Sequence, residues 1–167
     1  CWCSIAIVDM WTRYLTNEGP NGGKAEVARE QGVNCDVGLS ADGLADALED
    51  ETPNWFSSYI TNSRNSFAAK IVNEVNARTP VAVAGFTRYS DQAPKAMKHW
   101  FLVDAFRNTG ANFSSAWANI SGYFVNDPAY NTGFAWTVVS TAPDTFITRD
   151  VFFRDYASTY NRPIFGA

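Results

Sequence analysis

Two residues far apart in the sequence, Cys3 and His99, could together form an activated sulfur nucleophile. Cys3 stands at the predicted start of a helix, where free N–H groups and the helix dipole favour a thiolate. His99 is the only histidine of the chain, and it opens an apolar run that predicts a strand, so its ring can reach the rim of a sheet. An imidazole at that position could take the thiol proton, and the helix N–H groups could receive an oxyanion.

A third group is needed to orient the imidazole by accepting its other N–H. Asp127 is the candidate, because it ends the next predicted strand, and antiparallel neighbours bring the end of one strand beside the start of the other. Asn126 is the alternative, since an amide oxygen can accept the same bond. Neighbouring side chains on a strand face opposite ways, so only one of the two can face His99. Asp127 also precedes Pro128, a pairing that is common at turns without any catalytic role.

Helical periodicity fills the first half of the chain, and strand patterns fill the second. Apolar spacing and turn residues predict helices over residues 4–15, 25–30, 40–50 and 63–78, with Ser40 as the N-cap of the third. Strand patterns follow over residues 81–86, 99–106, 120–126 and 134–139, then a helix over 149–157 that Thr148 would cap and an edge strand over 162–165. Helices followed by a mostly antiparallel sheet predict an α+β fold in a single domain. Its helical half would cover about residues 1–80 and its sheet half about residues 81–167.

The composition narrows the classes of function. Apolar residues make up 46% of the 167 residues, which is typical of a globular protein with a core of its own. The net charge is −4 and the Lys and Arg residues are scattered, so we expect no nucleic-acid partner. No apolar run reaches the roughly 18 residues of a membrane-spanning helix, so we expect no membrane span. We also expect no cofactor.

Three cysteines, Cys1, Cys3 and Cys35, allow one disulfide and one free thiol. Together with His99 they could in principle bind zinc, but the Cys-x-Cys pair is tighter than the usual zinc spacing, so we expect no metal. The sequence begins at Cys1 without an initiator Met, which predicts that a segment was removed or is missing before it.

These features, in this order, resemble the papain-like cysteine peptidases. Trp2-Cys3 precedes an amphipathic helix, His99-Trp-Phe-Leu-Val opens a hydrophobic strand, and a later strand ends in Val125-Asn-Asp-Pro. The branch that the chain resembles most is that of the bacteriocin-leader peptidases and their secreted relatives, and a closing helix after Thr148 also fits it. The resemblance spans nearly the whole chain. It implies a thiol peptidase that cleaves peptides or proteins through an acyl-enzyme, with Cys3, His99 and Asp127 as its triad.

The resemblance leaves two candidate nucleophiles. Papain-like enzymes often have Trp directly after the nucleophile, which favours Cys1. Helix phase favours Cys3, because the same face of its helix then carries residues that can all be buried, namely Ala6, Ile7, Met10, Trp11 and Tyr14. The same count from Cys1 would direct Asp9 at the core, where an unpaired charge is costly. We therefore favour Cys3 and keep Cys1 as the alternative.

The resemblance also implies a disulfide. Papain-like enzymes often bridge a Cys just before the nucleophile to a downstream loop, which here would join Cys1 to Cys35. Such a bridge would suit a secreted or otherwise extracytoplasmic protein.

One departure from the family pattern keeps other functions open. The family usually carries a Gln a few residues before the nucleophile, where it donates to the oxyanion hole, and this sequence has no residue before Cys1. A precursor could supply that donor, backbone N–H groups could replace it, or the domain could be an inactive papain-like module used for binding. Two other enzymes also fit. One is a transglutaminase-like acyltransferase with the same triad, and the other is a self-processed hydrolase in which Cys1 uses its own α-amine as the base.

Overall fold

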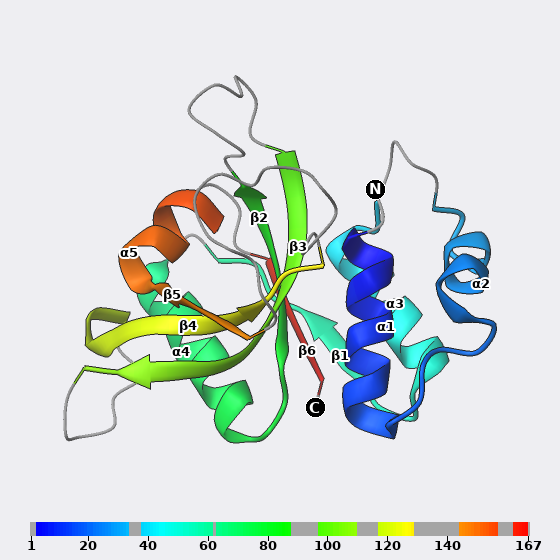
Figure 1. Ribbon diagram of the computed structural model, residues 1–167, viewed down its shortest axis with the longest axis horizontal. Helices are drawn as coiled ribbons and strands as arrows, with labels where there is room; N and C mark the ends of the chain where they lie inside the picture. Colours follow the sequence, from blue (N-terminus) through cyan, green and yellow to red (C-terminus); the bar gives the residue numbers. More distant parts are fainter. Residues whose placement is uncertain are drawn as a thin grey trace.

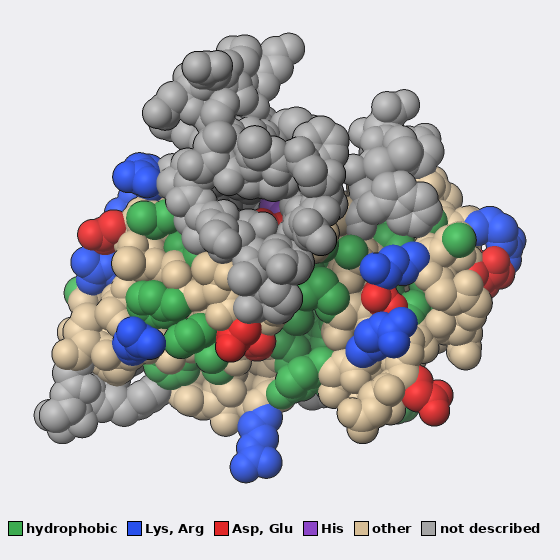
Figure 2. Space-filling view, in the orientation of Figure 1, with side chains coloured by type: hydrophobic (Ala, Val, Ile, Leu, Met, Phe, Trp, Pro, Cys, Tyr) green, Lys and Arg blue, Asp and Glu red, His purple; other side chains and the backbone are tan. Residues whose placement is uncertain are grey.

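The described part of the chain forms a six-stranded antiparallel sheet with helices packed on both sides of it (Figure 1). A computed structural model describes residues 3–33, 38–61, 63–87, 97–109, 117–128, 144–156 and 162–166. On the face seen in Figure 2, the described Lys and Arg side chains are dispersed rather than gathered on one element. The predicted α+β architecture, with helices first and a mostly antiparallel sheet after them, is confirmed.

The sheet has the strand order β1-β6-β2-β3-β4-β5, and every neighbouring pair is antiparallel. Its strands are β1 (Phe56–Ser58), β2 (Val81–Thr87), β3 (Met97–Asn108), β4 (Ile120–Asn126), β5 (Thr145–Thr148) and β6 (Arg162–Gly166). The strands expected over residues 81–86, 99–106 and 120–126 are confirmed. A strand is also present over the range expected at 162–165, but its predicted edge position is wrong, because β6 pairs with β1 on one side and β2 on the other. Strands β1 and β5 were not predicted, and the strand expected over residues 134–139 lies outside the described residues.

The predicted helices are present, with small shifts at their ends. They are α1 (Cys3–Thr16), α2 (Gly23–Glu30), α3 (Ala41–Glu51) and α4 (Arg64–Asn76), followed late in the chain by the short α5 (Arg149–Val151). Ser40 caps α3 as predicted, because its hydroxyl accepts the N–H of Gly43 at 3.1 Å. Thr148 precedes α5, but its side chain forms no capping bond, and the helix continues as a π-helical turn over Phe152–Tyr156. None of the helices in the described residues has the length and apolar character needed to cross a membrane.

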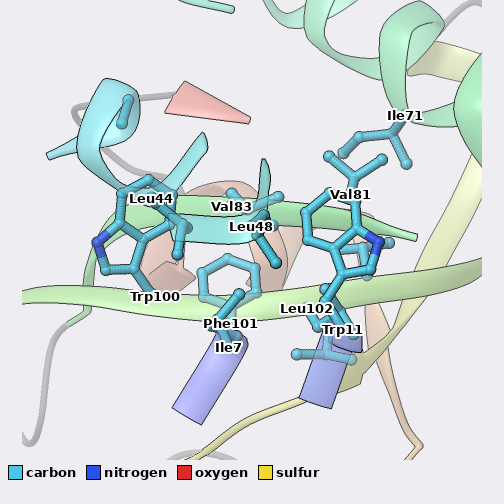
Figure 3. Packing of buried hydrophobic residues seen from close by; sticks show 14 of the residues in the cluster. Ile7, Trp11, Leu44, Leu48, Ile71, Val81, Val83, Trp100, Phe101 and Leu102 are labelled. Carbon is cyan, nitrogen blue, oxygen red and sulfur yellow. The ribbon is translucent and has the colours of Figure 1, made fainter. Parts of the chain in front are cut away.

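One part of the core joins the early helices to the middle of the sheet (Figure 3). Ile7 and Trp11 of α1 meet Leu44 and Leu48 of α3 over strands β2 and β3. The ring of Trp11 also packs edge-to-face on Phe56 of β1, with 5.1 Å between ring centroids. This packing fixes α1 against the sheet, and the N-terminus of α1 carries Cys3.

A second part of the core is aromatic and joins α4 and the π-helical turn to the sheet. Phe152 of the turn lies 4.4 Å from the ring centroid of Tyr123 in β4 and 5.6 Å from that of Phe101 in β3. Phe67 of α4 completes the cluster at 6.1 Å from Phe152. Because Phe101 is two residues from His99, this cluster holds in place the segment of β3 that carries the imidazole.

The buried face of α1 differs from the prediction. Asp9, expected to be kept out of the core, is only 7% exposed, and its carboxylate pairs with Arg13 at 3.0 Å and Lys24 at 3.3 Å. Tyr14, expected to be buried, is 51% exposed. The reason is that α1 contacts β3, α2 and α3, so most of its circumference is covered and the carboxylate finds cationic partners. Helix phase therefore does not decide between Cys1 and Cys3, and the choice depends on which sulfur meets His99.

Candidate active site

Cys3 begins α1 and is partly buried at the N-terminus of that helix. Its thiol is free. The sulfur is hydrogen-bonded to the side chain of His99 and to the backbone N–H of Trp100, the residue that follows His99 on β3. In Figure 1 the N-terminal end of α1 and the first residues of β3 both lie on the upper side of the molecule. Helix α1 and strand β3 thus meet at this sulfur.

His99 and Asp127 form a buried pair. The Nε2 atom of His99 lies 2.7 Å from the Oδ1 atom of Asp127. Asp127 directly follows β4, and β4 runs antiparallel to β3 with Asn126 opposite Leu102, so the end of one strand lies beside the start of the other. Because Asp127 occupies Nε2, the nitrogen left to meet the sulfur of Cys3 is Nδ1. The ring is visible in Figure 2 only as a small purple patch.

The neighbours of His99 favour its charged form. Burial by itself disfavours an imidazolium, but the hydrogen bond to Asp127 and then the one to Cys3 outweigh it and raise the pKa of His99 to about 9. An imidazole with an ordinary pKa would be mostly neutral at pH 8. Here the ring keeps its proton at that pH.

The neighbours of Cys3 favour the thiolate. Burial by itself raises the pKa of the thiol. The hydrogen bond and positive charge of His99, together with the N–H of Trp100, outweigh burial and bring the pKa of Cys3 below its ordinary value. Both shifts therefore favour the same charge distribution, a thiolate beside an imidazolium.

Comparison with known proteins shows the family to which the chain belongs. The model of the Peptidase_C39 like family matches residues 1–162. The chain belongs to this family. No curated protein sequence matches the chain. The predicted resemblance to papain-like cysteine peptidases is therefore confirmed, and membership indicates cysteine peptidase activity on peptides or proteins.

A solved structure shows the same fold. The crystal structure of a protein described as a C39-like peptidase from Bacillus anthracis superposes with a TM-score of 0.60, over 99% of this chain and 88% of the other. The two sequences are 12% identical, so the likeness concerns the fold alone.

In this C39-like chain the side chain of Asn126 faces away from His99. Its Nδ2 donates to Oδ2 of Asp104 at 2.6 Å, and its Oδ1 accepts the N–H of Asp144 at 2.8 Å. Because side chains alternate along a strand, Asn126 and Asp127 point in opposite directions. Of these two candidates for orienting His99, Asp127 is the one that contacts the imidazole. Asn126 instead links β4 to β3 and to the residue before β5.

Other sequence predictions for this C39-like site fall on residues that the structure does not describe. Cys1, the alternative nucleophile, and Cys35, its expected disulfide partner, lie outside the described residues. In the part of the chain that the structure describes, no three His, Cys, Asp or Glu side chains come together in a group that could hold a metal.

Sequence reasoning missed two contacts beside the site, those of Leu39 and of Asp104. Leu39 acts through its backbone atoms, for which the sequence carries no signal. Asp104 stands in the middle of a hydrophobic strand, and this was a signal that an unusual polar contact would be found there.

Proposed function

We propose that this protein is a thiol peptidase in which Cys3 is the nucleophile, His99 exchanges protons with it and Asp127 orients the imidazole. The observation that carries the proposal is the continuous chain of hydrogen bonds from the Cys3 sulfur through His99 to Asp127. Sulfur, imidazole and carboxylate arise from three separate elements, and each is placed at the end of its helix or strand. The pKa shifts of Cys3 and His99 both support a thiolate–imidazolium pair.

The reaction that follows has two halves. In the first, the Cys3 thiolate attacks the peptide carbonyl carbon, and the free N–H groups at the start of α1 stabilise the oxyanion that forms. The C–N bond then breaks, His99 gives its proton to the leaving amine, and a thioester to Cys3 remains. In the second half, His99 takes a proton from water, the hydroxide attacks the thioester, and the carboxylic acid leaves with the thiolate restored.

The test is turnover of a peptide library by the purified protein and its cysteine variants, followed by mass spectrometry. We expect Cys3→Ala to abolish cleavage and the thioester adduct, and Cys1→Ala to retain both. Cleavage by Cys3→Ala at the wild-type rate would contradict the proposal. A primary amine is added in parallel, and amide products that replace hydrolysis products would show an acyltransferase instead.

We also propose a disulfide between Cys1 and Cys35 and an extracytoplasmic location for the protein. They are supported by the resemblance to secreted relatives, and peptide mapping without reduction checks the disulfide.

A further inference from the structure

The backbone of Leu39 lies between the residue that follows Cys3 and the residue that follows His99. Its N–H donates to Oγ of Ser4 at 3.1 Å, and its carbonyl accepts Nε1–H of Trp100 at 3.2 Å. Ser4 is 0% exposed and Trp100 is 6% exposed, and Leu39 is partly buried, so both bonds are partly shielded from water. One residue of the segment before α3 therefore contacts both neighbours of the sulfur–imidazole pair.

These two bonds join elements that are otherwise held together mainly by apolar packing. Ser4 belongs to α1 and Trp100 belongs to β3, and no backbone ladder connects that helix to that strand. Apolar burial is not directional, whereas a hydrogen bond restricts both distance and angle. The backbone N–H of Trp100 itself bonds the Cys3 sulfur, so a shift of Trp100 would move a direct partner of the thiolate.

We propose that Ser4 and Trp100 are positioning residues which, through the backbone of Leu39, hold the Cys3 sulfur in register with the imidazole of His99. This inference rests on the proposed function, because it names what keeps that site assembled. Neither side chain has to touch the substrate. A displacement of reacting groups by about 1 Å can lower a rate about 100-fold, so such a contact can matter as much as a direct one.

A simpler explanation is that Ser4 and Trp100 merely satisfy their own buried polar atoms. Two neighbours on α1 argue against it. Trp11 Nε1 and Thr12 Oγ1 are also buried, and among the described residues neither has a hydrogen-bond partner. Among the described residues, protein partners are thus found for the indole and hydroxyl next to His99 and Cys3 but not for the matching groups further along α1.

Those two unpaired groups provide matched controls for the test. Trp100→Phe and Ser4→Ala each remove one bond to Leu39, whereas Trp11→Phe makes the same change of ring size, and Thr12→Val removes a hydroxyl, without loss of a bond. The rate at which iodoacetamide alkylates Cys3 is measured from pH 5 to pH 10 by fragment-ion mass spectrometry, which distinguishes Cys3 from Cys1.

For Trp100→Phe and Ser4→Ala we expect alkylation at pH 6 to slow about 3- to 10-fold, with the pH midpoint raised by about half to one unit. At pH 10, where every thiol is ionised, the rates should match wild type. The two control variants should follow the wild-type curve throughout.

The outcomes separate this inference from the proposed function. If wild-type Cys3 titrates like an ordinary thiol, the proposed function fails. Only the positioning role fails if wild-type Cys3 is activated but Ser4→Ala and Trp100→Phe show the same pH dependence of alkylation as wild type. It also fails if alkylation slows in the control variants as much as in Ser4→Ala and Trp100→Phe. Ser4→Ala removes a single oxygen, so it decides the question even if circular dichroism shows that Trp100→Phe does not fold.

Discussion

Two opposite charges stabilise each other at the residue scale. The thiolate of Cys3 is favoured by the proton on His99, and that proton is favoured by Asp127 on the other side of the ring. The charged pair persists from the lowered pKa of Cys3 up to the pKa of His99 at about 9. In the proposed mechanism, the sulfur is protonated below this window and cannot attack, and above it the imidazole has no proton to give to the leaving amine.

Asp127→Asn should narrow that window from its alkaline side. Without the carboxylate the pKa of His99 falls, so the alkaline limb of kcat/KM should move from near pH 9 to lower pH by about 1–3 units. The measurement is a pH profile of kcat/KM on a cleaved peptide. Asp150→Asn, which changes an exposed carboxylate, is the control and should leave the profile in place. An alkaline limb that stays near pH 9 in Asp127→Asn would show that Asp127 does not set the charge of the ring.

The three proposed catalytic residues were predictable from the sequence for a common reason. At helix N-termini and strand ends, backbone geometry alone decides which side chains can reach a shared site. Such positions are occupied by Cys3, His99 and Asp127. Ser4 and Trp100 could not be recognised in the same way. Their shared partner is a backbone group of Leu39, and its position depends on how α3 packs rather than on the identity of that side chain.

At the scale of elements, Asn126 ties three strands together next to the site. Its amide bonds Asp104 of β3 and the N–H of Asp144, the residue before β5. Burial, and then the charge of Asp144, raise the pKa of Asp104, so the bond from Asn126 offsets part of the penalty of a carboxylate in that place.

Asn126→Ala should therefore destabilise the sheet. It leaves a partly buried carboxylate and a backbone N–H without their partner, and the expected loss is about 1–3 kcal/mol of unfolding free energy. Urea denaturation followed by circular dichroism measures it. Asn73→Ala, on the exposed face of α4, should change the unfolding free energy by less than about 0.5 kcal/mol. Equal midpoints for the two variants would mean that the network around Asn126 adds nothing to stability.

The elements themselves were predicted where their signals are local. The Ser40 cap and the apolar periodicity of α1, α3 and α4 identified these helices. The three residues of β1 are too few to show any alternation, because that strand exists only through its pairing with β6. The predicted orientation of α1 was wrong for a similar reason. The buried Asp9 pairs with Lys24 of α2 as well as with Arg13 of α1, and the packing of α2 on this face cannot be read from the periodicity of α1.

At the scale of the whole molecule, the site exists because helices α1 and α3 pack on the middle of the sheet. Cys3 is 96 positions from His99 in the sequence, and both are fixed by the core shared by α1, α3, β2 and β3 (Figure 3). No local segment can therefore assemble the pair. This also explains why the sequence could favour Cys3 but could not exclude Cys1, which is only two residues away.

The most direct test of the whole account is the rate at which iodoacetamide alkylates Cys3 at pH 6 in the wild-type protein and in His99→Gln. If the imidazole activates this sulfur, wild-type Cys3 should react at least about 10-fold faster than Cys3 in the variant, since an ordinary thiol is almost fully protonated at that pH. Equal rates in two folded proteins would contradict the account, because the imidazole would then have no influence on the sulfur that α1 places beside it.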